Sequence, residues 1–304
     1  MKPMDPDQIK EGEKAHRLFI GMPVYNGAAY IREALDSLVS QSYQDWTMLI
    51  SDNASEDETP DICKEYCKKD ERIRYVRQER NIGPVANFKY LLDQADAPFF
   101  MWAASDDTWH PDFIASCMQL LEKEGTIGFV FSNLAVIDSQ GRMIRDIPSF
   151  EKFSGKPSFR IICRYLLDPE INGKACLIYG IFRTEICRQS WVAVPDMGAW
   201  GSDYQFVLAA ISRGGVLIEK KVLFFKRFLD GSTHGTYPKP DMILHPSRYT
   251  FPFLTSYPYI WGTVQASSGT PFYWATLVLM VLRLPGSFFN FLRGLRGSLK
   301  EVTR

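Results

Sequence analysis

LFIGMPVYNG, residues 18–27, is the stretch that decides the fold. Leu18 to Val24 is a near-continuous apolar run, which is typical of a buried strand. The run ends at Tyr25-Asn26-Gly27, a turn-forming sequence. Apolar side chains then follow at helical spacing, at Tyr30, Ile31, Ala34, Leu35, Leu38 and Val39. The stretch therefore predicts a strand, a turn and a helix, which is the first unit of an α/β fold with a mainly parallel sheet.

The same alternation continues along the chain. Further strands are predicted at residues 46–51, 73–76, 98–104, 127–136, 175–182 and 216–225. Helices are predicted after residues 58, 84 and 111, over residues 159–167, and after residue 203. Residues 141–156 read as a turn and an extended polar connection, and the second half of the chain is less regular than the first.

Polar residues follow several of these strands directly. Tyr25-Asn26-Gly27, Asp52-Asn53 and Asp106-Asp107 each come at the carboxyl end of a predicted strand. In an open parallel sheet those ends line one crevice where ligands bind, so we expect these residues to meet. The alternative is that each is only a helix cap or a turn former.

Composition restricts the classes of partner. Lys and Arg together number 35, equal to Asp and Glu together, and this balance argues against nucleic acid as the partner. The six cysteines form no Cys-x-x-Cys pair, which indicates reduced thiols in the cytoplasm: Cys63, Cys67, Cys117, Cys163, Cys176 and Cys187. The polar extension over residues 1–16 has no apolar segment of the kind that a secretory signal carries.

The acids at the strand ends fit a particular chemistry. Asp106 and Asp107 are hard oxygen ligands that suit Mg²⁺ or Mn²⁺ when a diphosphate supplies further oxygens. Asp52 is placed to accept hydrogen bonds from a base or a ribose. Asp203 begins a predicted helix, where it serves either as an N-terminal cap or as a general base aimed into the crevice.

Other chemistries lack their sequence signatures. Neither G-x-x-x-x-G-K-[ST] nor G-x-G-x-x-G occurs, which argues against P-loop and Rossmann cofactor sites. There is no G-x-S-x-G, and the histidines lack metal-ligand spacing. Hydride transfer, kinase, serine hydrolase and zinc hydrolase functions are therefore disfavoured.

Taken in their order along the chain, the motifs at the strand ends resemble those of the family 2 glycosyltransferases, which are inverting enzymes with an A-type nucleotide-sugar fold. The resemblance runs from about Leu18 to Ser232. It rests on Pro23-Val24-Tyr25-Asn26-Gly27, Ser51-Asp52-Asn53-Ala54-Ser55-Glu56-Asp57, the segment from Asn81-Ile82-Gly83 to Asn87, Ser105-Asp106-Asp107, and Asp203.

The resemblance implies a role for each matching residue. The nucleotide-binding residues would be Pro23, Val24, Tyr25, Asn26, Asp52, Arg80 and Asp106. The metal, Mg²⁺ or Mn²⁺, would be held mainly by Asp107 with help from Asp106, and Asp203 would be the catalytic base. The chain departs from the family pattern at Ala104 and Ser202, where the family has acids.

The implied reaction moves one sugar, with inversion, from a nucleoside-diphosphate sugar to a hydroxyl of a glycan or a lipid-linked acceptor. The Gln-x-x-Arg-Trp signature of processive members is not visible. Two alternatives stay open. One is a catalytically silent nucleotide-sugar-binding scaffold, which Ala104 and Ser202 would explain, and the other is a sugar nucleotidyltransferase.

The organisation follows from these motifs. Residues 17–235 are expected to form the transferase domain, with a nucleotide-binding half at 17–138 and an acceptor-binding half at 139–235. Residues 236–304 form a C-terminal extension. Its part from 271 onward combines aromatic residues with Arg293, Arg296 and Lys300, which suits an amphipathic helical tail at the inner face of the plasma membrane. A helix pair that folds back on the domain, or a homodimer contact, is the alternative.

Overall fold

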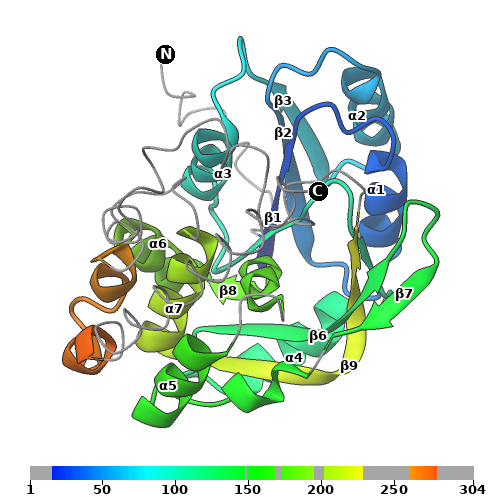
Figure 1. Ribbon diagram of the computed structural model, residues 1–304. Helices are drawn as coiled ribbons and strands as arrows, with labels where there is room; N and C mark the ends of the chain where they lie inside the picture. The colour runs from blue at the N-terminus through cyan, green and yellow to red at the C-terminus, as the bar shows by residue number, and fades with distance from the viewer. Residues whose placement is uncertain (1–15, 148, 169–172, 195–201, 229–260, 279–304) are drawn as a thin grey trace, which may run out of the picture.

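The computed structural model describes residues 16–147, 149–168, 173–194, 202–228 and 261–278. In these residues a single nine-stranded sheet runs through the molecule, with helices on both sides (Figure 1). The expected α/β architecture, a central sheet flanked by helices, is confirmed.

The sheet changes character across its width. Its order is β3-β2-β1-β4-β8-β6-β9-β5, with β7 added to β6. The pairs among β1 to β4, and the pair β6–β9, are parallel, while β8, β5 and β7 pair antiparallel with their neighbours. The strands are β1 (Leu18–Val24), β2 (Trp46–Asp52), β3 (Ile73–Arg77), β4 (Phe99–Trp102), β5 (Thr108–Trp109), β6 (Phe129–Ile137), β7 (Met143–Asp146), β8 (Ile181–Arg183) and β9 (Val216–Arg227).

The helices bury the faces that their apolar spacing predicted. In α1, for example, Ile31, Ala34, Leu35 and Leu38 are buried. Figure 1 shows α1 and α2 on one side of β1 to β3 and α3 on the other. The helices are α1 (Ile31–Val39), α2 (Thr59–Lys69), α3 (Pro84–Asp93), α4 (Phe113–Lys123), α5 (Phe159–Leu167), α6 (Thr184–Val192) and α7 (Ser202–Gly214), with 3-10 helices η2 (Phe150–Phe153) and η4 (Lys174–Tyr179).

The strand predicted at 175–182 is wrong for most of its length. The segment forms η4 and only then enters the short strand β8. Gly180 separates the two, and a Cβ there would lie 2.8 Å from the carbonyl oxygen of Val130. A short apolar run does not distinguish a buried helix from a buried strand, so the sequence pattern could not decide this segment. The helix α6 and the strands β5 and β7 were likewise not predicted.

The core continues to the carboxyl end of β4. Trp102, the last residue of β4, is fully buried, and its ring packs against five neighbouring rings, those of Phe88, Phe100, Phe182, Trp191 and Phe206. Aromatic contacts of this kind give a rigid support. The loop that carries Asp106 and Asp107 therefore begins from one of the best-packed points of the domain.

Part of the C-terminal extension packs on the domain. Residues 261–278 are helical at 261–266 and 273–278, and the Arg213 guanidinium on α7 donates to the carbonyl oxygens of Ala266 and Ser268. The described part of the chain holds no helix long and apolar enough to cross a membrane. Residues 1–15, 229–260 and 279–304 lie outside the described residues, so the predicted membrane or dimer contact of the tail remains a prediction.

Candidate active site

The loops after β1 and β2 are joined by hydrogen bonds. The backbone N–H of Asn26 donates to the Ser55 hydroxyl at 2.9 Å, and the Asn26 side-chain carbonyl accepts from the Glu56 N–H at 2.9 Å. Asn26 and Ala54 both have positive φ, 50° and 65°. Asn adopts this conformation more readily than most residues, so Asn26 suits the turn for a backbone reason as well.

A second set of contacts extends this loop pair. Gly27 donates to the Thr59 hydroxyl at 2.9 Å, and the Ala28 N–H donates to the Asp57 carboxylate at 3.0 Å. A Cβ at Gly27 would lie 3.3 Å from the Ser105 hydroxyl, so the β1 loop also lies close to the loop after β4. The structure thus brings together the three strand ends that the sequence predicted to converge.

Asp52 lies beneath the surface of this crevice. Its side chain is fully buried, and its two carboxylate oxygens accept from the Ser55 N–H at 2.8 Å and from the Tyr75 hydroxyl at 2.7 Å. The nearest cation is the Arg77 guanidinium, at 3.7 Å. Asp52 therefore orders the end of β2 and does not offer an oxygen to a base or a ribose in this conformation.

The loop after β3 is anchored by asparagines. Asn53 donates to the Asn81 side-chain carbonyl at 2.8 Å and accepts from the Ile82 N–H at 2.8 Å. Arg80, just before Asn81, is exposed. Of the other predicted nucleotide-binding residues, Tyr25 is 48% exposed and Val24 is buried. The predicted nucleotide-binding residues on the loops after β1 and β3 that a ligand can reach are therefore Tyr25, Asn26 and Arg80, which are exposed, and Pro23, which is half-buried.

Asp106 and Asp107 have different environments. Asp107 is fully buried, and its oxygens accept from the Lys226 ammonium at 3.0 Å and from the Arg227 N–H at 2.9 Å. The side chain of Asp106 is 34% exposed and lies 3.9 Å from the same ammonium. The accessible carboxylate is therefore that of Asp106, although the sequence analysis placed the main metal ligand at Asp107.

Burial and charge act together on this cluster. The pKa of Asp107 is raised to about 6 as the net result: burial raises it most, Lys226 lowers it, and Asp106 raises it. Burial lowers the pKa of Lys226, but Asp107, Tyr179, Asp106 and Cys176 together outweigh burial, so the net shift of the pKa is upward. At neutral pH the two side chains form an ion pair in which Asp107 is fully buried and Lys226 is 20% exposed.

Arg227 attaches the Asp106 loop to the rest of the domain. Its buried guanidinium donates to the Asp106 carbonyl at 2.9 Å, to the Asp138 carbonyl at 3.0 Å and to the Glu33 carboxylate at 2.5 Å. It also lies over the Tyr30 ring, 4.6 Å from the centroid. The Arg227 side chain on β9 therefore holds the loop that carries Asp106 and Asp107, and the start of α1, in place.

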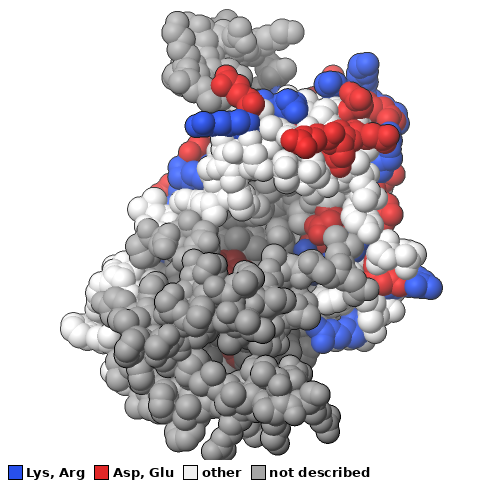
Figure 2. Space-filling view, turned by 45° about the horizontal axis from the view of Figure 1, so that its top comes forward, with Lys and Arg blue, Asp and Glu red and all other residues white. Residues whose placement is uncertain are grey.

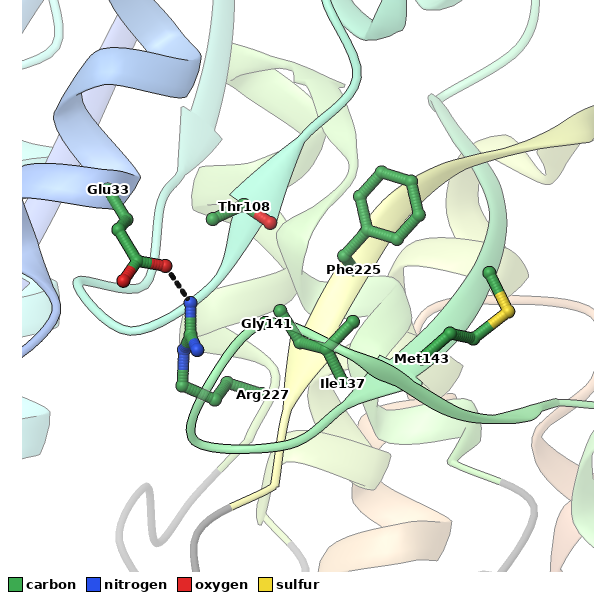
Figure 3. A pocket seen from close by; sticks show the side chains of 7 residues that line it. All are labelled: Glu33, Thr108, Ile137, Gly141, Met143, Phe225 and Arg227. Carbon is green, nitrogen blue, oxygen red and sulfur yellow. Dashed lines mark hydrogen bonds and ion pairs between the residues drawn. The ribbon is translucent and has the colours of Figure 1, made fainter.

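A cavity of about 320 Å³ lies beside this arginine (Figure 3). Figure 3 shows the Glu33–Arg227 ion pair at its wall. It is lined by Glu33, Thr108, Ile137, Gly141, Met143, Phe225 and Arg227. None of the predicted nucleotide-binding residues lines it, so this cavity is not the crevice that the sequence motifs define.

Asp203 lies in the first turn of α7. Its carboxylate accepts from the backbone N–H of the next residue, Tyr204, at 2.9 Å. A negative charge at this end of a helix is favoured by the helix dipole. The helix η4 contacts both this helix start and the end of β9. The Lys174 ammonium on η4 lies 5.8 Å from the centroid of the Tyr204 ring, and the Tyr179 ring, also on η4, has its centroid 5.5 Å from the Lys226 ammonium.

The described residues do not make the two-carboxylate metal site that the motif predicted. Both oxygens of Asp107 are engaged, and an ammonium already stands next to Asp106. In the described ranges no group of three His, Cys, Asp or Glu side chains is arranged to hold a metal ion. A divalent ion would find one accessible carboxylate here, with a cation 3.9 Å from it.

Lys226 and Arg227 were not predicted from the sequence. Both come at the end of a strand whose other terminal residues are apolar, after Leu223, Phe224 and Phe225. Burying a pair of basic residues at the end of a strand costs free energy unless acids pair with them. Two basic residues after an apolar run could therefore have indicated that acidic partners lie nearby. The acid that each one meets lies more than a hundred residues away, at Asp107 and Glu33.

The charged side chains over the loops of the domain are mixed in sign. Figure 2 shows Lys and Arg interspersed with Asp and Glu on the described part of this face. Among the exposed ion pairs of the described residues are Arg32 with Glu65 at 2.8 Å and Lys89 with Asp93 at 2.5 Å. Exposed pairs of this kind contribute little to stability, so the loop hydrogen bonds are more important for the shape of the site.

Comparison with solved structures bears on the fold. The model aligns with Staphylococcus aureus TarS 1–349, solved in complex with UDP-GlcNAc, at a TM-score of 0.58 and 20% identity, over 83% of this chain and 70% of that one. It also aligns with the Pyrobaculum calidifontis mannosyltransferase PcManGT, solved with GDP-Man and Mn²⁺, at a TM-score of 0.54 and 16% identity, over 94% and 76% of the two chains. The expected A-type fold is confirmed.

Comparison of sequences bears on the family. TuaG of Bacillus subtilis (strain 168), which carries the name of a teichuronic acid biosynthesis glycosyltransferase, is 32% identical over 119 residues, or 39% of this chain and 47% of its own length. The match thus spans about half of that relative. The uncharacterized glycosyltransferase RT0329 of Rickettsia typhi is 26% identical over 75% of this chain and 69% of its own. The family model for glycosyl transferase family 2 matches residues 19–182, over half of the sequence, and the chain therefore belongs to glycosyl transferase family 2.

Proposed function

We propose that the protein transfers one sugar, with inversion, from a nucleoside-diphosphate sugar to a hydroxyl of a glycan or a lipid-linked acceptor. One observation carries the proposal. The loops after β1, β2 and β4 are hydrogen-bonded or packed against one another, and the accessible carboxylate of Asp106 follows the last of these strands. This is the place where open α/β sheets bind nucleotides.

The donor would lie across these loops. Tyr25 is exposed on the loop after β1 and Arg80 on the neighbouring loop after β3, so a ring that stacks on a base and a cation that contacts the nucleotide are both available. Asp106 is suited to accept from a ribose hydroxyl, because its carboxylate keeps part of its surface. Asp52 supports this arrangement from below by holding the β2 loop.

The chemical step needs a base for the acceptor. A sugar hydroxyl is a weak nucleophile at neutral pH, so a carboxylate must take its proton as the oxygen attacks the anomeric carbon. We assign this role to Asp203. The bond from the anomeric carbon to the diphosphate oxygen breaks in the same step, its electron pair leaves with the nucleoside diphosphate, and the configuration inverts.

The similar proteins support proposals for the donor and the acceptor. TarS was solved with UDP-GlcNAc and PcManGT with GDP-Man, so uridine and guanosine donors are the first to try. TuaG is named for teichuronic acid biosynthesis, which supports a cell-envelope polysaccharide as the product. A cytoplasmic enzyme whose tail, residues 271–304, contacts the inner membrane surface stays a prediction, as does a homodimer.

The family and the Mn²⁺-containing neighbour support Mg²⁺ or Mn²⁺ as a cofactor. The described residues offer such an ion only the Asp106 carboxylate, and we therefore assign no step of the reaction to it.

The test combines binding and turnover. UDP, GDP and dTDP sugars are screened for thermal stabilisation, since a ligand that binds the folded state raises its stability. Transfer to an acceptor panel is then followed for the stabilising donor. Asp203→Asn is expected to lower kcat by about 10²–10⁴-fold with little change in donor affinity, the range typical of a lost general base.

Asp93→Asn on α3 is the matched control, since this carboxylate is 51% exposed and pairs only with Lys89 among the described contacts. It is expected to leave kcat unchanged. Stabilisation by a donor without turnover on any acceptor would instead favour the silent scaffold. Release of pyrophosphate from a nucleoside triphosphate and a sugar phosphate would favour the nucleotidyltransferase.

A further inference from the structure

We propose that Lys226 is the cation that binds the diphosphate of the donor, in the place where a divalent ion would otherwise stand between Asp106 and Asp107. The inference rests on the proposed function and deepens it. It makes Lys226 a catalytic residue, and it predicts that donor binding and transfer persist when divalent ions are removed.

The position of the ammonium carries the argument. The Lys226 ammonium lies 3.0 Å from an Asp107 oxygen and 3.9 Å from an Asp106 oxygen, so it faces both carboxylates of the motif. The distance from the Lys226 ammonium to the Asp106 oxygen is too long for a hydrogen bond. The hydrogen bond to Asp107 thus uses one of the three N–H donors of the Lys226 ammonium, and the Lys226 side chain remains 20% exposed. Donors are left for an incoming phosphate oxygen.

The surroundings hold the lysine where it is. Its ammonium lies 5.5 Å from the centroid of the Tyr179 ring, and the next residue, Arg227, is fixed by four hydrogen bonds, one from its backbone and three from its side chain. Asp107 is the hydrogen-bonded counter-ion that fixes this ammonium, at 3.0 Å. The Asp106 carboxylate is then released for a ribose hydroxyl.

The chemistry matches what the leaving group requires. As the bond to the anomeric carbon breaks, negative charge grows on the diphosphate oxygen, and a positioned ammonium stabilises that charge by a charge-assisted hydrogen bond. The site is partly buried, so screening by water is weaker than at an exposed lysine. Lys226 remains protonated throughout and transfers no proton in this step.

The test measures binding before turnover. Affinities of UDP, GDP and dTDP, and of the matching nucleosides, are measured by calorimetry in EDTA and again with Mn²⁺. Wild type is expected to bind its diphosphate at least about tenfold more tightly than the nucleoside in EDTA, the size of effect that a charge-assisted hydrogen bond provides. Transfer in EDTA is expected to stay within about threefold of transfer with Mn²⁺.

The variants are chosen so that folding does not confuse the result. Lys226→Met alone leaves Asp107 buried without its partner, so the neutral pair Lys226→Met with Asp107→Asn is tested beside it. The neutral pair is expected to lose the preference for the diphosphate while nucleoside affinity is kept, and Lys226→Arg is expected to retain most of the preference. Lys220→Met, on the same strand with a side chain 79% exposed, is the matched control and should behave as wild type.

Each other outcome counts against the proposal. A wild-type preference for the diphosphate that is present only with Mn²⁺ would overturn it, and so would a neutral pair that keeps the preference in EDTA. In both cases the glycosyltransferase function stands. If no nucleotide in the panel binds wild type with or without Mn²⁺, the proposed function fails, and the role of Lys226 fails with it.

Discussion

The Tyr75 hydroxyl donates to a carboxylate oxygen of Asp52 at 2.7 Å, inside the protein. The other Asp52 oxygen accepts from the Ser55 N–H at 2.8 Å. Burial raises the pKa of Tyr75 above its ordinary range, and the hydrogen bond to Asp52 raises it further, so the phenol stays a donor. The acid at the end of β2 thus joins β3 to the turn that begins at Asn53, which is a structural role.

Tyr75→Phe tests this role. It leaves one oxygen of a buried carboxylate without its donor, which is expected to lower the free energy of unfolding by about 1–3 kcal/mol in urea titrations. Nucleotide affinity of the folded protein should be unchanged. Tyr90→Phe on α3, outside this hydrogen-bond network, is the control. A loss of nucleotide affinity without a loss of stability would return Asp52 to the binding site.

Arg227→Met removes the side chain that holds the Asp106 loop. The carbonyl oxygens of Asp106 and Asp138 lose a charged donor, and Glu33 loses its partner. We expect a loss of about 2–4 kcal/mol in the free energy of unfolding, with weaker nucleotide binding as the loop relaxes. Glu33→Gln should cost less than about 1 kcal/mol, because the Glu33 side chain is 54% exposed. Equal losses for the two variants would contradict this account.

Gly214→Ala tests a close approach of two backbone segments. The Gly128 N–H donates to the Gly214 carbonyl at 2.8 Å, and a Cβ at Gly214 would lie 2.5 Å from the Gly128 Cα. Because backbone must move to admit the methyl group, we expect a loss of about 1–3 kcal/mol. Gly125→Ala, where a Cβ meets nothing within 4 Å, should stay within about 0.5 kcal/mol of wild type. Thermal unfolding of both variants decides the matter.

The Asp70–Arg72 pair predicts a pH dependence. Hydrogen bonds from the Arg72 guanidinium, 2.9 Å and 2.6 Å long, hold the pKa of Asp70 below its ordinary value of 3.8. A lowered pKa means that the pair stabilises the fold fully above about pH 4 and loses this contribution as the pH falls through the folded value. The difference in unfolding free energy between wild type and Asp70→Asn should therefore shrink between about pH 6 and about pH 3. A difference that grows toward acid would show that the sign is wrong.

Local patterns were enough for most elements in the first half of the chain, although not for β5 and β7. The apolar run at Leu18–Val24 and the spacing that follows it predicted β1 and α1, and β2, β3, β4 and β6 lie within about two residues of their predicted bounds. A buried strand and an amphipathic helix can each be recognised from the spacing of apolar residues within a short segment of sequence. The convergence of the three strand ends also followed, since parallel strands place their carboxyl ends at one edge.

The sequence by itself determined an α/β domain with acids gathered at the carboxyl ends of its parallel strands, because periodicity and turn residues act over a few positions. Only the tertiary structure decided which acids remain accessible. Asp52 and Asp107 are enclosed by Tyr75 and Lys226, while Asp106 keeps its surface. The physical reason is that desolvation and ion pairing depend on neighbours such as Lys226 and Arg227, which lie far along the chain from Asp107 and leave no trace in its local sequence.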